Sequence, residues 1–225
     1  MKNLFEEFQP AHVKRRLHTA ETFHRKNETA IASWVKGYQA LLADEIGNLF
    51  WQASPEHLAT VYCKIVEDLR NLSYTGQEIG AFCTRLDQSP SIALHVPGPL
   101  GLYVSALVNC SQDADITIVT SGLKGIIHLI GYRLPAGKRL TINGNAGDFA
   151  GAGLCGGTLI ISGSTANWCG AGMISGKIYV QQNAGNNLGQ WMHGGEIRID
   201  GAVSSIGEKR FGGRVKGNGG NDTSV

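Results

Sequence analysis

The fold of this chain is decided by residues 140–199, which read as three 19-residue segments and the start of a fourth: LTINGNAGDFAGAGLCGGT, LIISGSTANWCGAGMISGK, IYVQQNAGNNLGQWMHGGE and IRI. Each segment opens with an apolar or β-branched triplet and continues into a glycine-rich stretch. A fixed period near 20 residues is typical of a solenoid, in which every repeat forms one turn of a coil. The repeat therefore predicts one short strand per turn.

Equivalent positions of the repeat predict ladders along the axis of the coil, because parallel strands about 4.8 Å apart put identical positions above one another. Apolar ladders are expected at Leu140, Leu159, Ile178 and Ile197, at Ile142, Ile161, Val180 and Ile199, and at Leu154, Met173 and Met192. Glycine columns occur at Gly151, Gly170 and Gly189, and at Gly157, Gly176 and Gly195. The next copy is one residue shorter, with its glycines at Gly207 and Gly213.

Upstream of the regular segments the pattern continues with longer spacing. Apolar residues at 116–118 and at 92–96 precede the 140–142 triplet at intervals of 22 to 24 residues. We therefore predict a right-handed parallel β-helix of about six to seven turns over residues 91–216. A leucine-rich repeat would need several leucines and an Asn or Cys corner in each turn, which are missing. The polar, glycine-containing tail over 217–225 is predicted to be disordered.

Residues 1–90 have a different pattern, since only four of the 31 glycines precede Pro97. Apolar residues at three- and four-residue spacing predict a helix that opens at Glu28, and the triplet 54–56 supplies a cap, a first-turn proline and an acid for a second. Further helices are predicted over 77–86 and 10–25. The predicted inward positions of the two main helices are Ile31, Trp34, Val35, Tyr38, Leu41, Leu42, Ile46, Leu49 and Phe50, and Leu58, Val61, Tyr62, Ile65, Val66 and Leu69. The fold class is thus α+β, with a helical N-terminal region covering one end or one side of the solenoid.

Composition and charge narrow the classes of function. The chain has 225 residues, 42% of them hydrophobic, and a net charge of +2, so nothing global indicates a nucleic-acid or membrane-surface partner. No apolar run reaches the ~18 residues of a membrane span, and the N-terminus lacks the features of a signal peptide, so we expect a cytoplasmic location. The five cysteines have no metal-site spacing and are predicted to be reduced, buried small hydrophobes: Cys63, Cys83, Cys110, Cys155 and Cys169.

The glycine-rich segment 144–153 could be interpreted as a nucleotide or calcium site. A dinucleotide fingerprint requires a strand–turn–helix context, whereas these glycines recur every 19 residues among strands. A calcium-binding β-roll needs an aspartate in each turn. The column here is Asp148, Asn167, Asn186 and Ser205. We therefore predict a hydrogen-bonded ladder rather than a metal site.

The titratable residues do not form a catalytic constellation. The histidines considered are His12, His18, His24, His95, His128 and His193. The first three recur every six residues, which puts them on different faces of a helix. The basic cluster beside them is expected to be an ordinary solvent-exposed surface. His95 and His128 flank strands without an identifiable nucleophile. His193 is predicted to pack at a corner where the other turns have Cys155, Ile174 and Phe211. The carboxylates of the repeat are too dispersed for an acid–base pair: Asp113, Asp115, Asp148, Glu196, Asp200 and Glu208.

Aromatic residues interrupt the repeat at one point. Trp191 stands where the preceding turn has Gly172, and breaks in a repeat can mark contact surfaces. An exposed tryptophan near an open end would be an interface anchor. Phe149 and Trp168 share a column and are predicted to stack. The final turn is expected to carry most of its charge on Lys209, Arg210, Arg214 and Lys216, and to be able to dock onto another chain.

Residues 130–157, IGYRLPAGKRLTINGNAGDFAGAGLCGG, closely resemble the G-x-G-x-G domain, which closes the large subunit of glutamate synthase and also makes up one whole subunit of formylmethanofuran dehydrogenase. The resemblance lies in L-x-x-G before a strand, the G-x-A-x-D-aromatic corner and the G-x-G-L-x-G-G close, and extends over about residues 92–215. It implies a structural spacer or a subunit packed against catalytic ones, with no catalytic residue on these turns. Lys2 stands where an N-terminal amidotransferase would have its nucleophilic cysteine.

The main hypothesis is a non-catalytic structural or assembly subunit of a glutamate synthase-like multisubunit oxidoreductase. Two alternatives stay open: a scaffold subunit of a formylmethanofuran dehydrogenase-like complex for formyl transfer or hydrolysis, and a stand-alone binding module whose site lies between the helices and the β-helix. Expected partners are protein subunits of such a complex or further copies of the chain, with neither nucleic acid nor membrane. We assign no catalytic, cofactor-binding or metal-ligating residue and expect no cofactor.

Overall fold

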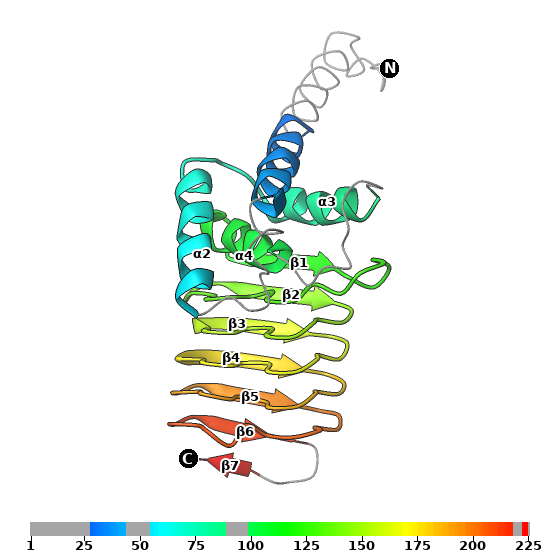
Figure 1. Ribbon diagram of the computed structural model, residues 1–225. Coiled ribbons are helices and arrows are strands. Elements are labelled where there is room, and N and C mark those ends of the chain that lie inside the picture. The colour runs from blue at the N-terminus through cyan, green and yellow to red at the C-terminus, as the bar shows by residue number, and fades with distance from the viewer. Residues whose placement is uncertain (1–27, 44–54, 89–98, 218–221, 225) are drawn as a thin grey trace, which may run out of the picture.

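The computed structural model describes residues 28–43, 55–88, 99–217 and 222–224. Helices gather at one end of a stack of strands that runs to the C-terminus (Figure 1). A helix over 28–43 is followed by α2 (Pro55–Leu69), α3 (Gly76–Asp87), α4 (Leu100–Cys110), β1 (Asp115–Val119), β2 (Arg139–Asn143), β3 (Cys155–Ile161), β4 (Ser175–Val180), β5 (Glu196–Ile199), β6 (Arg214–Lys216) and β7 (Asp222–Ser224). The helix predicted over 10–25 and the strand predicted over 92–96 lie outside the described residues.

The strands form one sheet in chain order, and β1 to β6 pair in parallel. Arg139 of β2 pairs with Thr158 of β3, a separation of 19 residues that recurs between β3 and β4 and between β4 and β5. Glu196 pairs with Arg214, a separation of 18, so the shortened final copy is confirmed. The three apolar ladders are buried throughout. The parallel β-helix and its repeat are therefore confirmed.

The solenoid has about four turns, so the prediction of six to seven was wrong. One reason is α4, which occupies residues that were expected to belong to an early coil. Nine of its eleven residues, Leu100 to Val108, are buried, so the segment is apolar nearly all round and carries no helical period in its sequence. An apolar run of this length does not distinguish a buried helix from buried strand, and only its surroundings decide.

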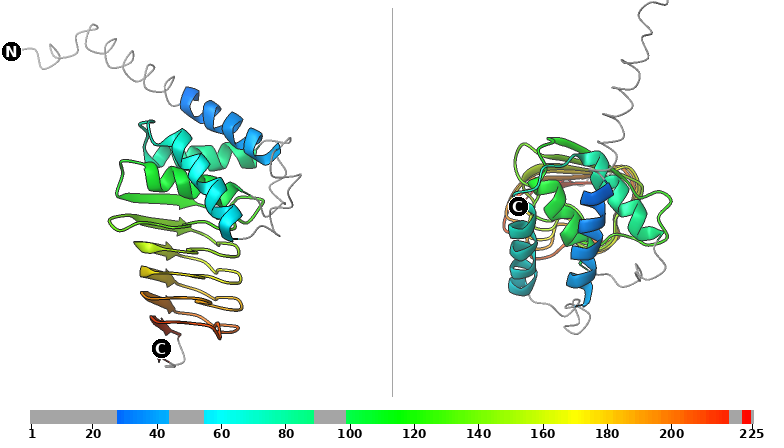
Figure 2. Two further views of the ribbon diagram at one scale, coloured as in Figure 1. Left: turned by 60° about the vertical axis from the view of Figure 1, so that its left-hand side comes forward. Right: turned by 90° about the horizontal axis from the view of Figure 1, so that it is seen from above.

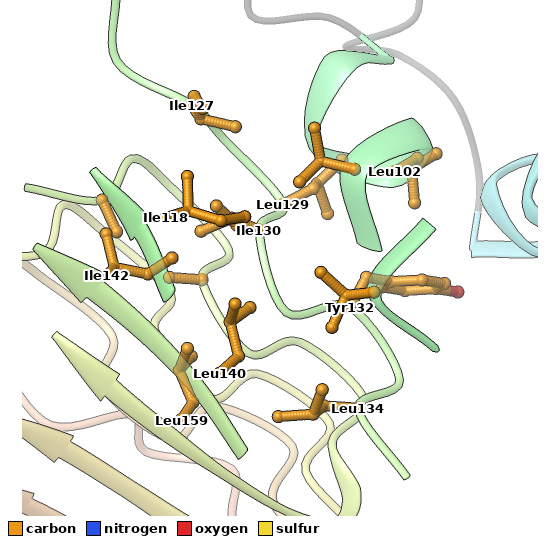
Figure 3. Close-up of a cluster of buried hydrophobic side chains, with 14 of the residues drawn as sticks. Leu102, Ile118, Ile127, Leu129, Ile130, Tyr132, Leu134, Leu140, Ile142 and Leu159 are labelled. Carbon is orange, nitrogen blue, oxygen red and sulfur yellow. The ribbon is translucent and has the colours of Figure 1, made fainter. Parts of the chain in front are cut away.

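Helix α4 lies directly on the first turn of the coil. The hydroxyl of Ser105 donates a hydrogen bond to the carbonyl of Leu129 (3.1 Å) and accepts one from the backbone N–H of Tyr132 (3.0 Å). Leu102 of α4 belongs to the same apolar cluster as Ile130 and Leu140 of the coil (Figure 3). Seen along the axis, the helices lie over the end of the stack (Figure 2). The prediction that helices cover one end of the solenoid is confirmed.

An aromatic cluster joins the 28–43 helix to α3 and α4. Trp34 meets Tyr74 edge-to-face with ring centroids 4.8 Å apart, and Phe82 lies 5.6 Å from Tyr103. Among the predicted inward positions within the described residues, the structure buries Ile31, Trp34, Tyr38, Leu41, Val61, Ile65 and Leu69 and leaves Val35, Leu42, Leu58, Tyr62 and Val66 partly buried against the core. The predicted start of α2 at Pro55 and the helix over 77–86 are also confirmed.

The far end of the solenoid is closed by the chain itself. Strand β7, within the tail predicted to be disordered, pairs antiparallel with β6. The outer edge of β6 would otherwise present backbone N–H and C=O groups without strand partners. Within the described part of the chain, no helix combines the length and the apolar character that crossing a membrane requires.

All five cysteines are free thiols, but they are not all buried as predicted. Cys83 and Cys169 are buried, Cys110 and Cys155 are half-buried, and Cys63 is exposed on α2. Burial raises the pKa of Cys83 to about 12 and that of Cys169 to about 12, the latter against a smaller opposing effect of a hydrogen bond with Thr165. These two thiols behave as small hydrophobes at neutral pH.

The buried thiols predict a loss of stability at alkaline pH. The folded-state pKa of Cys169, about 12, exceeds the ordinary thiol value of 9.0, so its stabilising effect is complete below about pH 9 and is lost as pH rises toward 12. Within this window each such thiol lowers the free energy of unfolding by about 1.4 kcal/mol per pH unit. We expect Cys169→Ala to make the pH slope shallower by about that amount in urea titrations. Lost packing shifts stability equally at every pH, so an unchanged slope would contradict the prediction.

Candidate interaction surface

The glycine-rich corners use their backbone N–H groups within the solenoid. Gly151 donates to the carbonyl of Ile130 on one side (2.8 Å), and Gly153 donates to the carbonyl of Ala171 on the other (2.8 Å). The next corner repeats this arrangement with Gly170 and Gly172. A phosphate-binding loop needs N–H groups that point at the ligand. These groups instead connect each turn to its two neighbours.

The predicted polar ladder is present. The Oδ1 of Asp148 accepts hydrogen bonds from the backbone N–H (2.8 Å) and the side-chain amide (3.1 Å) of Asn167. Asn167 Oδ1 accepts the same pair of bonds from Asn186, at 2.9 and 3.2 Å. Ser205 ends the ladder by donating to Asn186 Oδ1 (3.4 Å). These oxygens therefore bind the next turn of the coil, and the expected ladder is confirmed.

A second polar ladder, not predicted from the sequence, runs three residues before the first. Asn145 Oδ1 accepts a hydrogen bond from the backbone N–H of Ser164 (2.8 Å). Ser164 Oγ accepts one from Asn183 (3.3 Å), and Asn183 Oδ1 accepts one from Ala202 (2.9 Å). The signal was present, because three hydrogen-bonding side chains recur at 19-residue spacing. It was obscured because the column mixes amide and hydroxyl side chains.

The histidines that the structure describes have structural contacts. His128 Nδ1 accepts a hydrogen bond from the backbone N–H of Asp148 (3.0 Å) and lies 3.3 Å from its carboxylate. His193 stacks on Phe211 with ring centroids 4.8 Å apart, which confirms its predicted packing role. Phe149 and Trp168 stack at 5.0 Å as predicted. His12, His18, His24 and His95 lie outside the described residues.

Most of the carboxylates considered for a flank site have a partner within the fold. Asp113 Oδ2 accepts a hydrogen bond from the backbone N–H of Gly76 at the start of α3 (2.8 Å). Three others form ion pairs with nearby basic side chains: Asp115 with Arg139 (3.1 Å), Asp200 with Arg198 (3.0 Å) and Glu196 with Lys216 (3.4 Å). These carboxylates therefore stabilise the fold through contacts within the chain.

Exposed apolar side chains gather at one corner of the last turns. The backbone N–H of His193 donates to the carbonyl of Met173, and that of Phe211 donates to the carbonyl of Met192, so Ile174, His193 and Phe211 follow one another on successive turns. Ile174 is 56% exposed and Phe211 65%. Trp191, two residues before His193, is 44% exposed. We call Ile174, Trp191, His193 and Phe211 the corner patch.

Trp191 adopts a backbone conformation that favours glycine. Its φ is 58°, close to the 63° of Gly172 at the equivalent position of the preceding turn. A left-handed conformation costs a non-glycine residue about 1–2 kcal/mol. At the predicted break in the repeat the backbone thus keeps a left-handed conformation, as it also does at Arg133 and Phe149 (φ 52° and 59°). Its backbone N–H donates to the carbonyl of Lys209, which places the Lys209–Phe211 segment beside it.

Comparison with known proteins found no match among family models, curated proteins or solved structures. Among the residues that the structure describes, no three or more His, Cys, Asp or Glu side chains gather in a way that could hold a metal ion. The geometry of the chain itself is therefore the basis for a functional proposal.

Proposed function

We propose that this protein is a structural and assembly subunit, without catalytic activity of its own, in a cytoplasmic, glutamate synthase-like multisubunit enzyme. The observation that carries the proposal is the pair of polar ladders, one through Asp148, Asn167 and Asn186 and one through Asn145, Ser164 and Asn183. Side chains that could otherwise act on a ligand connect successive turns. Hydrogen bonds repeated along a coil favour a stiff element that holds other subunits at a fixed separation.

The resemblance of residues 130–157 to the G-x-G-x-G domain supports the same role. In this structure the stretch runs from the first turn through β2 and the glycine corner into β3. The matching elements include Leu134 and Gly137 before β2, and Asp148 and Phe149 at the corner, where each contacts the following turn. In glutamate synthase the resembling domain is a spacer between catalytic domains, and such a spacer needs these contacts rather than a reactive group.

The state of the native protein tests this proposal. We expect the endogenous chain, purified under mild conditions from its own cells, to elute as a particle several times larger than the single chain. Mass spectrometry should identify glutaminase-like and flavin-dependent synthase-like proteins in fixed proportion to it. Molybdenum- or tungsten-type subunits in that particle would replace glutamate synthase by a formylmethanofuran dehydrogenase-like complex. Elution as a free monomer would overturn the assembly role.

A further inference from the structure

We propose that His128 is a pH-sensitive switch at the junction of α4 with the first two turns of the coil. In its neutral form the imidazole accepts a hydrogen bond from the backbone N–H of Asp148, and in its protonated form it donates to the carboxylate of the same residue. The side chain of His128 is 23% exposed, so protons can reach it from solvent. This device goes beyond the assembly role and does not depend on it.

His128 is the first member of the polar ladder that continues through Asp148 and Asn167. The residues that follow the first two members, Leu129 and Phe149, each donate their backbone N–H to the carbonyl of the next member. His128 and Asp148 therefore occupy equivalent positions of successive turns. His128 Nδ1 accepts the backbone N–H of Asp148 (3.0 Å) as Asp148 Oδ1 accepts that of Asn167 (2.8 Å). Imidazole is the only side chain of this ladder whose kind ordinarily changes charge between about pH 5 and pH 8.

The Nδ1 atom of His128 faces two groups with opposite requirements. It lies 3.0 Å from the backbone nitrogen of Asp148 and 3.3 Å from the Oδ2 atom of that residue. The neutral ring with its proton on Nε2 has a lone pair at Nδ1, which accepts the N–H. When Nδ1 takes a proton from solvent, this bond is lost because two donors face each other, and the new N–H pairs with the carboxylate. Protonation therefore leaves the backbone N–H of Asp148 without its acceptor.

The carboxylate of Asp148 is the charged group that faces the imidazole from the second turn. Its Oδ1 atom already accepts two hydrogen bonds from Asn167, which leaves Oδ2 for the ring. Helix α4, LGLYVSALVNC, contains no charged residue. The nearest basic residues along the chain are Lys124 and Arg133. The backbone N–H of Lys124 donates to the carboxylate of Asp87 at the end of α3, and the guanidinium of Arg133 lies over the ring of the neighbouring tyrosine. The change of partner therefore takes place with Asp148.

The packing around His128 connects its side chain to the second turn and its backbone to α4. A Cβ at Gly147 would lie 2.8 Å from Cγ and 2.9 Å from Nδ1 of His128, so glycine there lets the ring approach the backbone. The next turn has Ala166 at the equivalent position. On the other side, the carbonyl oxygen of His128 is the atom that a Cβ at Gly101 of α4 would overlap. A change at the imidazole therefore acts where the helical end of the molecule rests on the coil.

Amide hydrogen exchange followed by NMR tests the change of partner. The protection of the Asp148 backbone N–H is divided by that of Asn167, which cancels the direct effect of pH on exchange chemistry. We expect this ratio to fall about fivefold between about pH 8 and about pH 5, the loss expected for one hydrogen bond. Nitrogen-15 spectra of the imidazole should show a proton on Nε2 and none on Nδ1 at the higher pH. A constant ratio, or a proton on Nδ1 at the higher pH, would overturn the proposal.

Three variants assign the response to the imidazole. His128→Asn supplies the amide acceptor that Asn167 supplies on a later turn and cannot titrate, so the ratio should keep its high value at both pH values. His128→Leu removes the acceptor and should give the low ratio at both. Gly147→Ala should lower the ratio at the higher pH by displacing the ring. Continued protection of the Asn186 amide shows that the coil of each variant is folded. A pH response that persists in His128→Asn would come from another group and would refute the assignment.

Discussion

Gly101→Ala is expected to lower the free energy of unfolding by about 3 kcal/mol, although alanine is the better helix former. Gly101 lies in the first turn of α4, where the helix rests on the coil. A Cβ there would overlap the carbonyl oxygen of His128 and would lie 2.7 Å from its carbonyl carbon and 2.9 Å from that of Leu129. These are backbone atoms of the first turn, so relief requires α4 to move away as a unit.

Gly80→Ala is the matched control for this prediction. Gly80 also lies inside a helix, α3, but a Cβ at that position would meet no heavy atom within 4 Å. The same substitution should therefore raise the free energy of unfolding by about 0.5–1 kcal/mol, the usual gain from replacing a helical glycine. Urea denaturation followed by circular dichroism would measure both values. Equal stability of the two variants would mean that α4 is not tightly seated on the first turn.

The repeat was predictable because it depends on spacing alone. A separation of 19 residues aligns Leu140 with Leu159 and Asp148 with Asn167 in any parallel coil, and the structure has that register. The shortened final copy was also predictable, since Gly207 and Gly213 both follow the preceding glycines of their columns by 18 residues instead of 19. Helix α4 was not predictable, because Leu100–Cys110 is apolar on nearly every side and its type is set by burial between α2, α3 and the first turn.

The candidate interaction surface was also predictable only in part from the sequence. Trp191 could be found from the sequence, because the two preceding turns have Gly153 and Gly172 at the same position of the repeat. The corner column of Ile174, His193 and Phe211 also followed from the spacing, whereas the exposure of Ile174 and Phe211 did not, since it depends on the direction in which each side chain leaves the backbone. The hydrogen bond from the backbone N–H of Phe211 to the carbonyl of Met192 confirms that Phe211 follows His193 in this column.

The second prediction with a large expected effect concerns the glycine columns and compares Gly172 with Gly176, four residues further along the chain. Gly176 has φ 97° and Gly172 has φ 63°, so both are unfavourable for other residues. A Cβ at Gly176 would overlap the carbonyl oxygen of Gly157 and would lie 2.7 Å from the carbonyl carbon of Gly156, whereas one at Gly172 would meet no heavy atom within 4 Å. We expect Gly176→Ala to cost about 3 kcal/mol or more and Gly172→Ala only about 1 kcal/mol.

The expected difference in stability arises because the two glycine columns have different surroundings. Backbones of successive turns touch at Gly157 and Gly176, so a side chain there would separate β3 from β4. At Gly172 the new side chain would project away from the coil, and only the conformational cost would remain. Urea unfolding of both variants measures the contrast, and a Gly172→Ala as destabilising as Gly176→Ala would contradict it. A small cost at Gly172 would also show that this column tolerates a side chain, as the half-exposed Trp191 of the next turn indicates.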